Sequence, residues 1–319
     1  MHRLRGGWIP IVAVMVILAV LPAVGMPRSW SLYLFLFFIY LAMANMWNLI
    51  AGYSGLISLC QPAFIGLAGY TLVICTWIGL PLYLGIIAGA MVATAFALLI
   101  SIPVFRLSGI YFSIGTLVIP EALRIAFFLW RPIGGEMHGG GAGYMVKGIA
   151  GVSMVEFYWF ALVIGIASIV LMRLVLRSTL GLGLASIRDN DRAAASCGID
   201  VFKLKLYSFV ISAFVTGIAG AIFYIYQGYI EPASAFNIRW TMIVMLATVI
   251  GGMGTEEGPI IGTAIVVFLH FLLARYAGIS LLIQGIILVG IMLLAPQGII
   301  GVLRKNQFYR SLAQSISMG

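Results

Sequence analysis

The chain has 319 residues, of which 8% are charged and 63% are apolar. Soluble domains carry about 25% charged residues, so this composition excludes a soluble fold of this size. Three cysteines exclude a disulfide scaffold, and the net charge of +9 is scattered rather than gathered into a nucleic-acid-binding patch. No charged residue occurs between Arg28 and Arg106. Because lipid excludes open sheets and long apolar runs form helices, we expect an all-α integral membrane protein.

Ten apolar segments follow one another along the chain, and a spanning helix needs about 20 such residues. They are 8–24, 32–51, 62–78, 82–104, 107–130, 157–174, 206–226, 241–250, 260–274 and 281–294. The first also fits a signal peptide with a small-residue cleavage site at Ala23-Val24-Gly25. Segment 241–250 is too short to span alone. We predict a polytopic bundle of about 8–10 transmembrane segments, including broken or re-entrant helices, in one transmembrane domain over 1–319.

The basic residues in the loops predict the orientation. With both termini in the cytoplasm, the outer side carries Arg28, Arg131, Lys147, Arg239 and Arg275. The inner side then carries more than twice as many: Arg3, Arg5, Arg106, Arg173, Arg177, Arg188, Arg192, Lys203, Lys205, Arg304, Lys305 and Arg310. We therefore expect cytoplasmic termini, a glycine-rich outer loop at 131–156, an inner loop at 176–205 and a cytoplasmic tail at 295–319.

Two glycine-punctuated breaks interrupt the apolar sequence, at 55–66 and 252–262, and each contains a proline followed by a glycine. Paired broken helices in two halves indicate an internal inverted repeat and a transport site near the membrane midplane. The alternative is that glycine and proline are simply common in membrane helices.

Uncharged polar residues gather at these breaks. Asn45 and Asn48 share a helical face at i and i+3 and lead into Ser54, Ser58 and Gln61. These residues, with Thr255 at the second break, are candidates to line a translocation pathway. Alternatively, their side chains satisfy the broken backbone or bridge neighbouring helices.

Glu121 and Arg124 form the sharpest electrostatic feature, since they meet on one face of segment 107–130. A charge in hydrocarbon costs about 2.5–3.5 kcal/mol or more, so such a pair faces the protein interior or a cavity. It is either a gate in a pathway or an ion pair that locks helix packing near the outer surface.

Catalytic and metal-binding constellations are absent from the sequence. His2, His138 and His270 are far apart, the cysteines lack metal-ligand spacing, and no Gly-Lys-Ser/Thr motif follows a glycine-rich loop. We therefore expect a protein that is not an enzyme, that binds no metal or cofactor, and whose ATP use comes from other subunits.

Residues 181–199 in the inner loop are typical of a short amphipathic helix. Asp191 suits a first turn, three alanines favour helix, and Gly198 ends it. Such an element between spans is either a docking helix or an ordinary connector.

Four sequence blocks together resemble the LivM-type permease subunit of branched-chain amino acid ABC importers. They are 48–59 with 63–70, 106–117 through Glu121 and Arg124, 187–198 with 205–221, and Gly251-Gly252-Met253-Gly254-Thr255 through Pro259 and Gly262. Pro296-Gln297-Gly298 also fits, and the resemblance covers 8–303. Cys60, Pro62, Glu256-Glu257, Asp189-Asn190-Asp191 and the outer loop depart from the usual pattern.

The resemblance implies a multi-pass protein of a bacterial inner membrane that works by alternating access. Its implied partners are a second homologous permease, two cytoplasmic ATPases that hold ATP and Mg²⁺, an extracytoplasmic binding protein, and membrane lipid. The implied cargo is branched-chain or other hydrophobic amino acids, or related small polar solutes such as amides and urea. The implied ATPase-coupling residues are Arg188, Asp189, Asp191, Arg192, Ala194 and Gly198. The alternative is an ion-coupled secondary carrier of a small solute.

Overall fold

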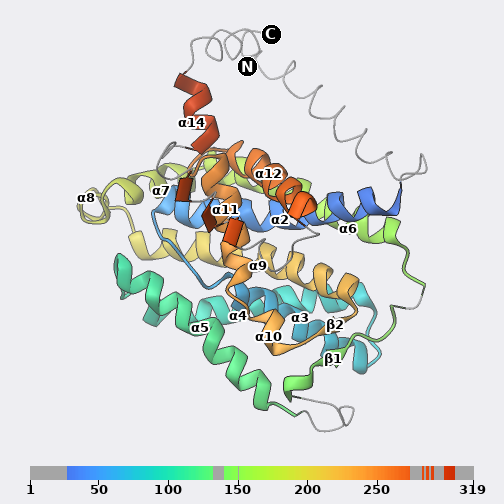
Figure 1. The fold of residues 1–319 in the computed structure, drawn as a ribbon. Helices are drawn as coiled ribbons and strands as arrows, with labels where there is room; N and C mark the ends of the chain where they lie inside the picture. Colours follow the sequence, from blue (N-terminus) through green and yellow to red (C-terminus); the bar gives the residue numbers. More distant parts are fainter. Residues whose placement is uncertain are drawn as a thin grey trace.

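The computed structural model describes residues 27–131, 140–149, 151–273, 282–283, 285–286, 289–290 and 298–305. Within them the chain folds as a bundle of α-helices, which confirms the predicted all-α membrane class (Figure 1). The predicted first span at 8–24, its signal-peptide alternative, most of the predicted span at 281–294 and most of the tail lie outside the described residues.

The helices follow the predicted spans to within a few residues. They are α2 (Arg28–Ser54), α3 (Gln61–Trp77), α4 (Leu82–Val104), α5 (Ile110–Leu129), α6 (Met154–Leu176), α7 (Thr179–Asp189), α8 (Asp191–Ser196), α9 (Val201–Gln227), α10 (Pro232–Ala235), α11 (Arg239–Gly251), α12 (Gly258–Leu273) and α14 (Gly298–Lys305). Among the described residues, six helical segments are long and apolar enough to cross a membrane: α2, α4, α5, α6, α9 and α10 together with α11.

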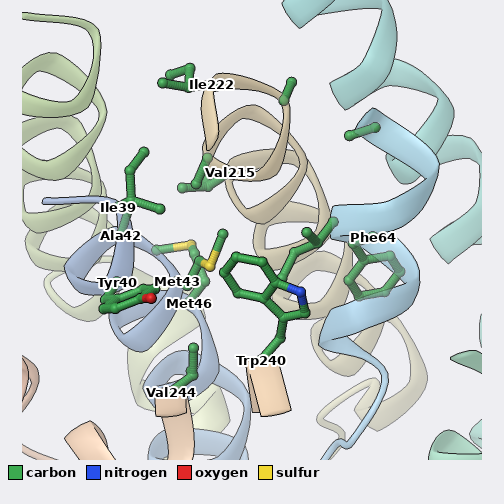
Figure 2. Close-up of a cluster of buried hydrophobic side chains, with 14 of the residues drawn as sticks. Ile39, Tyr40, Ala42, Met43, Met46, Phe64, Val215, Ile222, Trp240 and Val244 are labelled. Atoms are coloured by element: carbon green, nitrogen blue, oxygen red, sulfur yellow. The ribbon is translucent and has the colours of Figure 1, made fainter. Parts of the chain in front are cut away.

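The centre of the bundle is formed by α2, α3 and α9, whose side chains are mostly buried. Figure 2 shows this core, with Met43 and Met46 of α2, Phe64 of α3, Val215 of α9 and Trp240 of α11 converging. α4 packs on α3 and α9, and α6 packs on α2. By contrast, α5 lies at the edge of the bundle and leaves most of its surface exposed (Figure 1). An apolar helix with one buried stripe and one open face is suited to contact lipid or another membrane subunit.

A non-helical segment, residues 55–60, separates α2 from α3, as the glycines predicted. α2 ends at Gly55, which adopts a left-handed φ of 72°, and the Leu56 N–H donates to Ile50 O at 3.2 Å. This is a left-handed glycine stop, a conformation that glycine adopts without steric cost. α3 then begins at Gln61 with Pro62 in its first turn, where the missing N–H costs nothing.

The glycine-rich outer loop contains structure that the sequence did not predict. Within it lie the 3₁₀ turn η2 (Gly140–Ala142) and the strand β1 (Tyr144–Met145), and α6 begins at Met154. β1 pairs antiparallel with β2 (Tyr229–Ile230), Tyr144 opposite Ile230. Two-residue strands are too short to show an alternating pattern, so composition alone could not reveal this pairing.

The inner loop folds as two helices, so the prediction of a single helix over 181–199 is wrong. The break falls at Asn190, which is extended at φ −163° and ψ 111°. Its side-chain oxygen accepts hydrogen bonds from the N–H groups of Arg192 and Ala193, both at 3.0 Å. Asparagine competes for backbone groups in this way and so starts a new helix rather than continuing the old one.

Candidate functional site

The last turns of α2 meet the second glycine break at Asn48. Its side-chain Nδ2 donates to Thr255 O at 2.8 Å, and its Oδ1 accepts from the Gly254 N–H at 2.8 Å. Asn48 is fully buried. A Cβ on Gly52 would overlap Asn48 Oδ1 and the Gly254 backbone, so only glycine lets the segments approach this closely. The end of α2 and the turn before α12 therefore form one hydrogen-bonded junction, which we call the Asn48 junction.

The other predicted pathway residues each make a hydrogen bond within the chain, and all of them are buried except Thr255, which is half-buried. Asn45 Nδ2 donates to Ser168 Oγ of α6 at 3.0 Å, and Gln61 Nε2 donates to Ser212 Oγ of α9 at 3.4 Å. The remaining hydroxyls bond local backbone: Ser54 to Ile50 O at 2.6 Å, Ser58 to the Cys60 N–H at 3.3 Å, and Thr255 to Gly252 O at 2.7 Å. The arrangement thus ties helices together, and a role of these residues in translocation stays a prediction.

The α7–α8 hairpin reaches the Asn48 junction through Arg188. Arg188 Nη1 donates to Gly52 O at 3.2 Å, while its Nε lies 3.6 Å from Asp189 Oδ1. Figure 1 shows α7 and α8 at one end of the bundle, opposite the β1–β2 end. One arginine therefore connects an exposed hairpin to the backbone at the end of the central helix.

The remaining predicted coupling residues divide between surface and interior. Asp191 is exposed and pairs with Lys205 of α9, and Arg192 is exposed on α8. Ala194 is only 4% exposed, so its methyl group packs inside the chain. Gly198 takes a left-handed φ of 83° at the end of the hairpin. In this structure, the hairpin surface is therefore charged around Asp189 to Arg192, with Ala194 beneath it.

A second ion pair joins α6 to the Asn48 junction. Arg173 Nε donates to Glu256 Oε2 at 3.2 Å, with both side chains about one third exposed. The sequence did not predict that Glu256 pairs with Arg173. The two residues are far apart in the sequence, and no local spacing signals such a contact.

Just beyond the hairpin, Asp200 caps the start of α9. Its Oδ1 accepts from the Lys203 N–H at 3.1 Å, and its Oδ2 lies 2.8 Å from Lys203 Nζ. The hydrogen bond from the Lys203 side chain holds the pKa of Asp200 below its usual value. Asp200 is therefore ionised at neutral pH and fixes the beginning of α9 beside the hairpin.

Glu121 and Arg124 meet on α5 as their spacing predicted. Arg124 Nε donates to Glu121 Oε2 at 2.9 Å, and Arg124 Nη2 contacts Glu121 Oε1. The pair is not enclosed by this chain, because the side chains are 55% and 38% exposed, respectively. It borders a cavity of about 540 Å³ between α5 and the segment that joins α10 to α11. The structure thus puts a charged pair at the mouth of an open cavity.

A metal or redox role finds no support in the part of the chain that the structure describes. There, no group of three or more His, Cys, Asp and Glu side chains comes together. Cys60 and Cys75 are buried and Cys197 is exposed, all as free thiols.

Comparison with known proteins decides the family. Residues 29–296 match the family described as the branched-chain amino acid transport system permease component. The chain belongs to this permease family. The high-affinity branched-chain amino acid transport system permease proteins LivM of Salmonella typhimurium and Escherichia coli are 27% and 28% identical to it, over 84% of this chain and 69% of theirs. A probable LivH permease of Methanocaldococcus jannaschii is 32% identical over 49% of each chain. No solved structure matches.

Membership confirms the predicted resemblance and the membrane class. The permease is a multi-pass membrane protein and a transport component rather than an enzyme. Residues that act in a permease lie along a pathway or in contacts with partner subunits. Among the described residues, the Asn48 junction, the hairpin and the Glu121–Arg124 cavity are the candidates.

Proposed function

We propose that this chain forms half of the translocation pathway of an ABC importer for branched-chain or other hydrophobic amino acids. We assign this cargo because the relatives are named as branched-chain amino acid permeases. Amides or urea are further candidate solutes, because they are also small and polar. Relatives named LivM and LivH are both similar to this chain, which supports a second, homologous permease as its membrane partner. An extracytoplasmic binding protein would deliver the solute.

The observation that carries this proposal is the bond between Arg188 and Gly52. The hairpin lies at one end of the bundle (Figure 1), carries charges of both signs and contacts the central helix directly. A pair of ATPases that binds ATP and Mg²⁺ would dock on this hairpin and move the end of α2. The abundance of arginine and lysine at this end supports a cytoplasmic orientation for the hairpin and for both termini.

Co-purification and reconstitution test the proposal. A tagged chain expressed with its neighbouring transport genes should bring down two ATPases and a second permease. The complex in liposomes, supplied with its binding protein, should take up leucine only when ATP is present on the side of the membrane that carries the ATPases. Uptake by this chain alone, driven by a proton or sodium gradient, would contradict the proposal and favour the ion-coupled carrier.

Arg188→Glu tests the hairpin itself. The substitution removes the donor to Gly52 O and puts a carboxylate beside that carbonyl, so ATP hydrolysis should continue while leucine uptake falls by at least about tenfold. Arg106→Glu, at an exposed position after α4 and outside the hairpin, makes the same change of charge without touching Gly52 and should leave uptake unchanged. Equal uptake in the Arg188 variant and the unmodified complex would refute the coupling path through Gly52.

A further inference from the structure

The cavity beside Glu121 and Arg124 has the size and the walls of a small-molecule site. Its volume of about 540 Å³ lies within the range of about 300–1,000 Å³ typical of ligand pockets. Apolar walls come from Leu117 of α5 and from Phe236 and Ile238 of the α10–α11 connection. Mostly apolar walls with a few convergent charged groups are characteristic of binding sites for small organic molecules.

The ion pair retains bonding capacity for a ligand. A guanidinium has five N–H donors, and only two nitrogens of Arg124 face Glu121. The Glu121 carboxylate has further lone pairs, and its side chain is 55% exposed. A positive and a negative group therefore lie side by side with free donors and acceptors, which matches the paired carboxylate and ammonium of a zwitterion.

Lipid is a poor occupant of the space in front of this pair. An ionised side chain facing hydrocarbon costs at least about 2.5–3.5 kcal/mol, and here two such groups are exposed in the middle of an apolar helix. This face of α5 is therefore expected to border water or protein. A polar space beside an apolar helix could admit a polar solute that crosses the membrane.

The apolar wall is held rigidly from behind. Phe236 is 2% exposed and stacks on Tyr70 at 5.9 Å between ring centroids, with 5° between their planes. The centroid of the Phe127 ring lies 5.2 Å from that of the Phe236 ring. A Cβ on Gly66 would overlap the Phe236 ring, so the glycine provides the space in which the ring sits. A fixed aromatic ring in the wall of the same cavity suits an aliphatic side chain.

We propose that this cavity binds the transported amino acid, with its carboxylate on Arg124, its ammonium on Glu121 and its apolar side chain against Leu117, Phe236 and Ile238. The inference rests on the proposed function and names the ligand class of one site within it: a zwitterion with an aliphatic side chain. It also moves the predicted solute contacts from the buried asparagines to the exposed face of α5.

The test measures which ligand group each charged side chain recognises. The assembled transporter in nanodiscs, without its binding protein, would be loaded with labelled leucine and challenged with leucine, leucinamide and 4-methylpentanoate. Leucinamide lacks the carboxylate and 4-methylpentanoate lacks the ammonium, so each should compete at least about tenfold less well than leucine. Arg124→Gln should bring the leucine-to-leucinamide ratio close to one, and Glu121→Gln should do so for the leucine-to-4-methylpentanoate ratio.

Two further variants keep the outcome unambiguous. Lys203→Gln removes another exposed i,i+3 ion pair, with Asp200 at 2.8 Å, and should leave both ratios unchanged. Leu117→Ala leaves the charges in place and should lower the preference for leucine over alanine by about three- to tenfold, even where the charge variants fail to assemble. A uniform loss of affinity for all three compounds would assign the pair a packing role and overturn the inference.

The inference and the proposed function fail separately. An unmodified complex without ATP-driven leucine uptake would contradict the proposed function. A complex that takes up leucine but shows no saturable leucine binding, or whose Glu121 and Arg124 variants keep unmodified ratios, would overturn this site alone.

Discussion

Replacing Asn48 by alanine is expected to weaken the fold more than any other single polar truncation among the predicted pathway residues. The alanine removes both hydrogen bonds of the Asn48 junction, so the Gly254 N–H and the Thr255 carbonyl lose their partners together. Each backbone group left without a partner costs about 1–3 kcal/mol. Because Gly254 and Thr255 are half-buried and gain some water, the lower part of the range applies. We therefore expect a loss of about 2–3 kcal/mol.

Asn45→Ala is the matched control on the same helical face. Asn45 makes one side-chain bond, to Ser168, whose hydroxyl still donates to Gly165 O at 2.7 Å when Asn45 is gone. Interhelical side-chain bonds in membranes average about 0.6 kcal/mol, so this variant should lose less than about 1 kcal/mol. Asn48→Asp should be worse than Asn48→Ala, because it keeps an acceptor for Gly254, loses the donor to Thr255, and adds a buried charge.

The measurement is the unfolding free energy of the purified complex in a denaturing-detergent titration, with leucine uptake measured on the same preparations. The expected order of loss is Asn48→Asp, then Asn48→Ala, then Asn45→Ala. A loss in Asn48→Ala no larger than that in Asn45→Ala would show that the end of α2 and the second glycine break are held together by packing alone. That result would refute the junction as an energetic link.

Two further predictions concern the edges of the site. The pKa of Asp200 is lower in the folded chain than its usual value of about 3.8, so its bonds with Lys203 stabilise the fold fully above pH 3.8 and are lost as pH falls through the folded-state pKa. Hydrogen exchange in the first turn of α9 should therefore rise on acidification. Asp200→Asn should remove that pH dependence. Gly66→Ala should lower the free energy of unfolding by about 1–3 kcal/mol and weaken leucine binding, because the added Cβ would displace the packed Phe236 ring. Gly290→Ala should do neither, because a Cβ at Gly290 would meet no other atom within 4 Å.

The sequence predicted most of the helices because each span had to supply its own apolar length. It also found the Glu121–Arg124 pair, whose i,i+3 spacing is a local property of one helix. It did not find the pair of Arg173 and Glu256, which depends on how α6 packs against a distant turn. Local periodicity carries no information about such contacts between helices.

The error in the inner loop has a different cause. Helix propensity favoured one helix through Asn190, since the alanines that follow it are strong helix formers. The side chain of Asn190 instead caps a new helix, and a single cap bond of about 1 kcal/mol is enough to divide a short exposed segment. In contrast, Phe236 could not be recognised at all, because its role depends on the space left by Gly66.

Direct contacts join the hairpin to the non-helical segment 55–60, and that segment to the helix that lines the cavity. These contacts explain why the first glycine break lies between α2 and α3. Arg188 holds Gly52, just before the extended segment that follows Gly55. That segment then lies along α5, where Ser113 donates to Ile57 O at 2.8 Å and Thr116 accepts from the Leu59 N–H at 3.0 Å.

Thr116 lies little more than one turn before Glu121 on the same helix, so a shift of the segment acts on the helix that carries the charged pair. A continuous helix through 55–60 would satisfy its own backbone and leave α5 without these bonds. The break therefore exposes the backbone groups through which, under the proposed coupling, movement of the hairpin would reach the cavity.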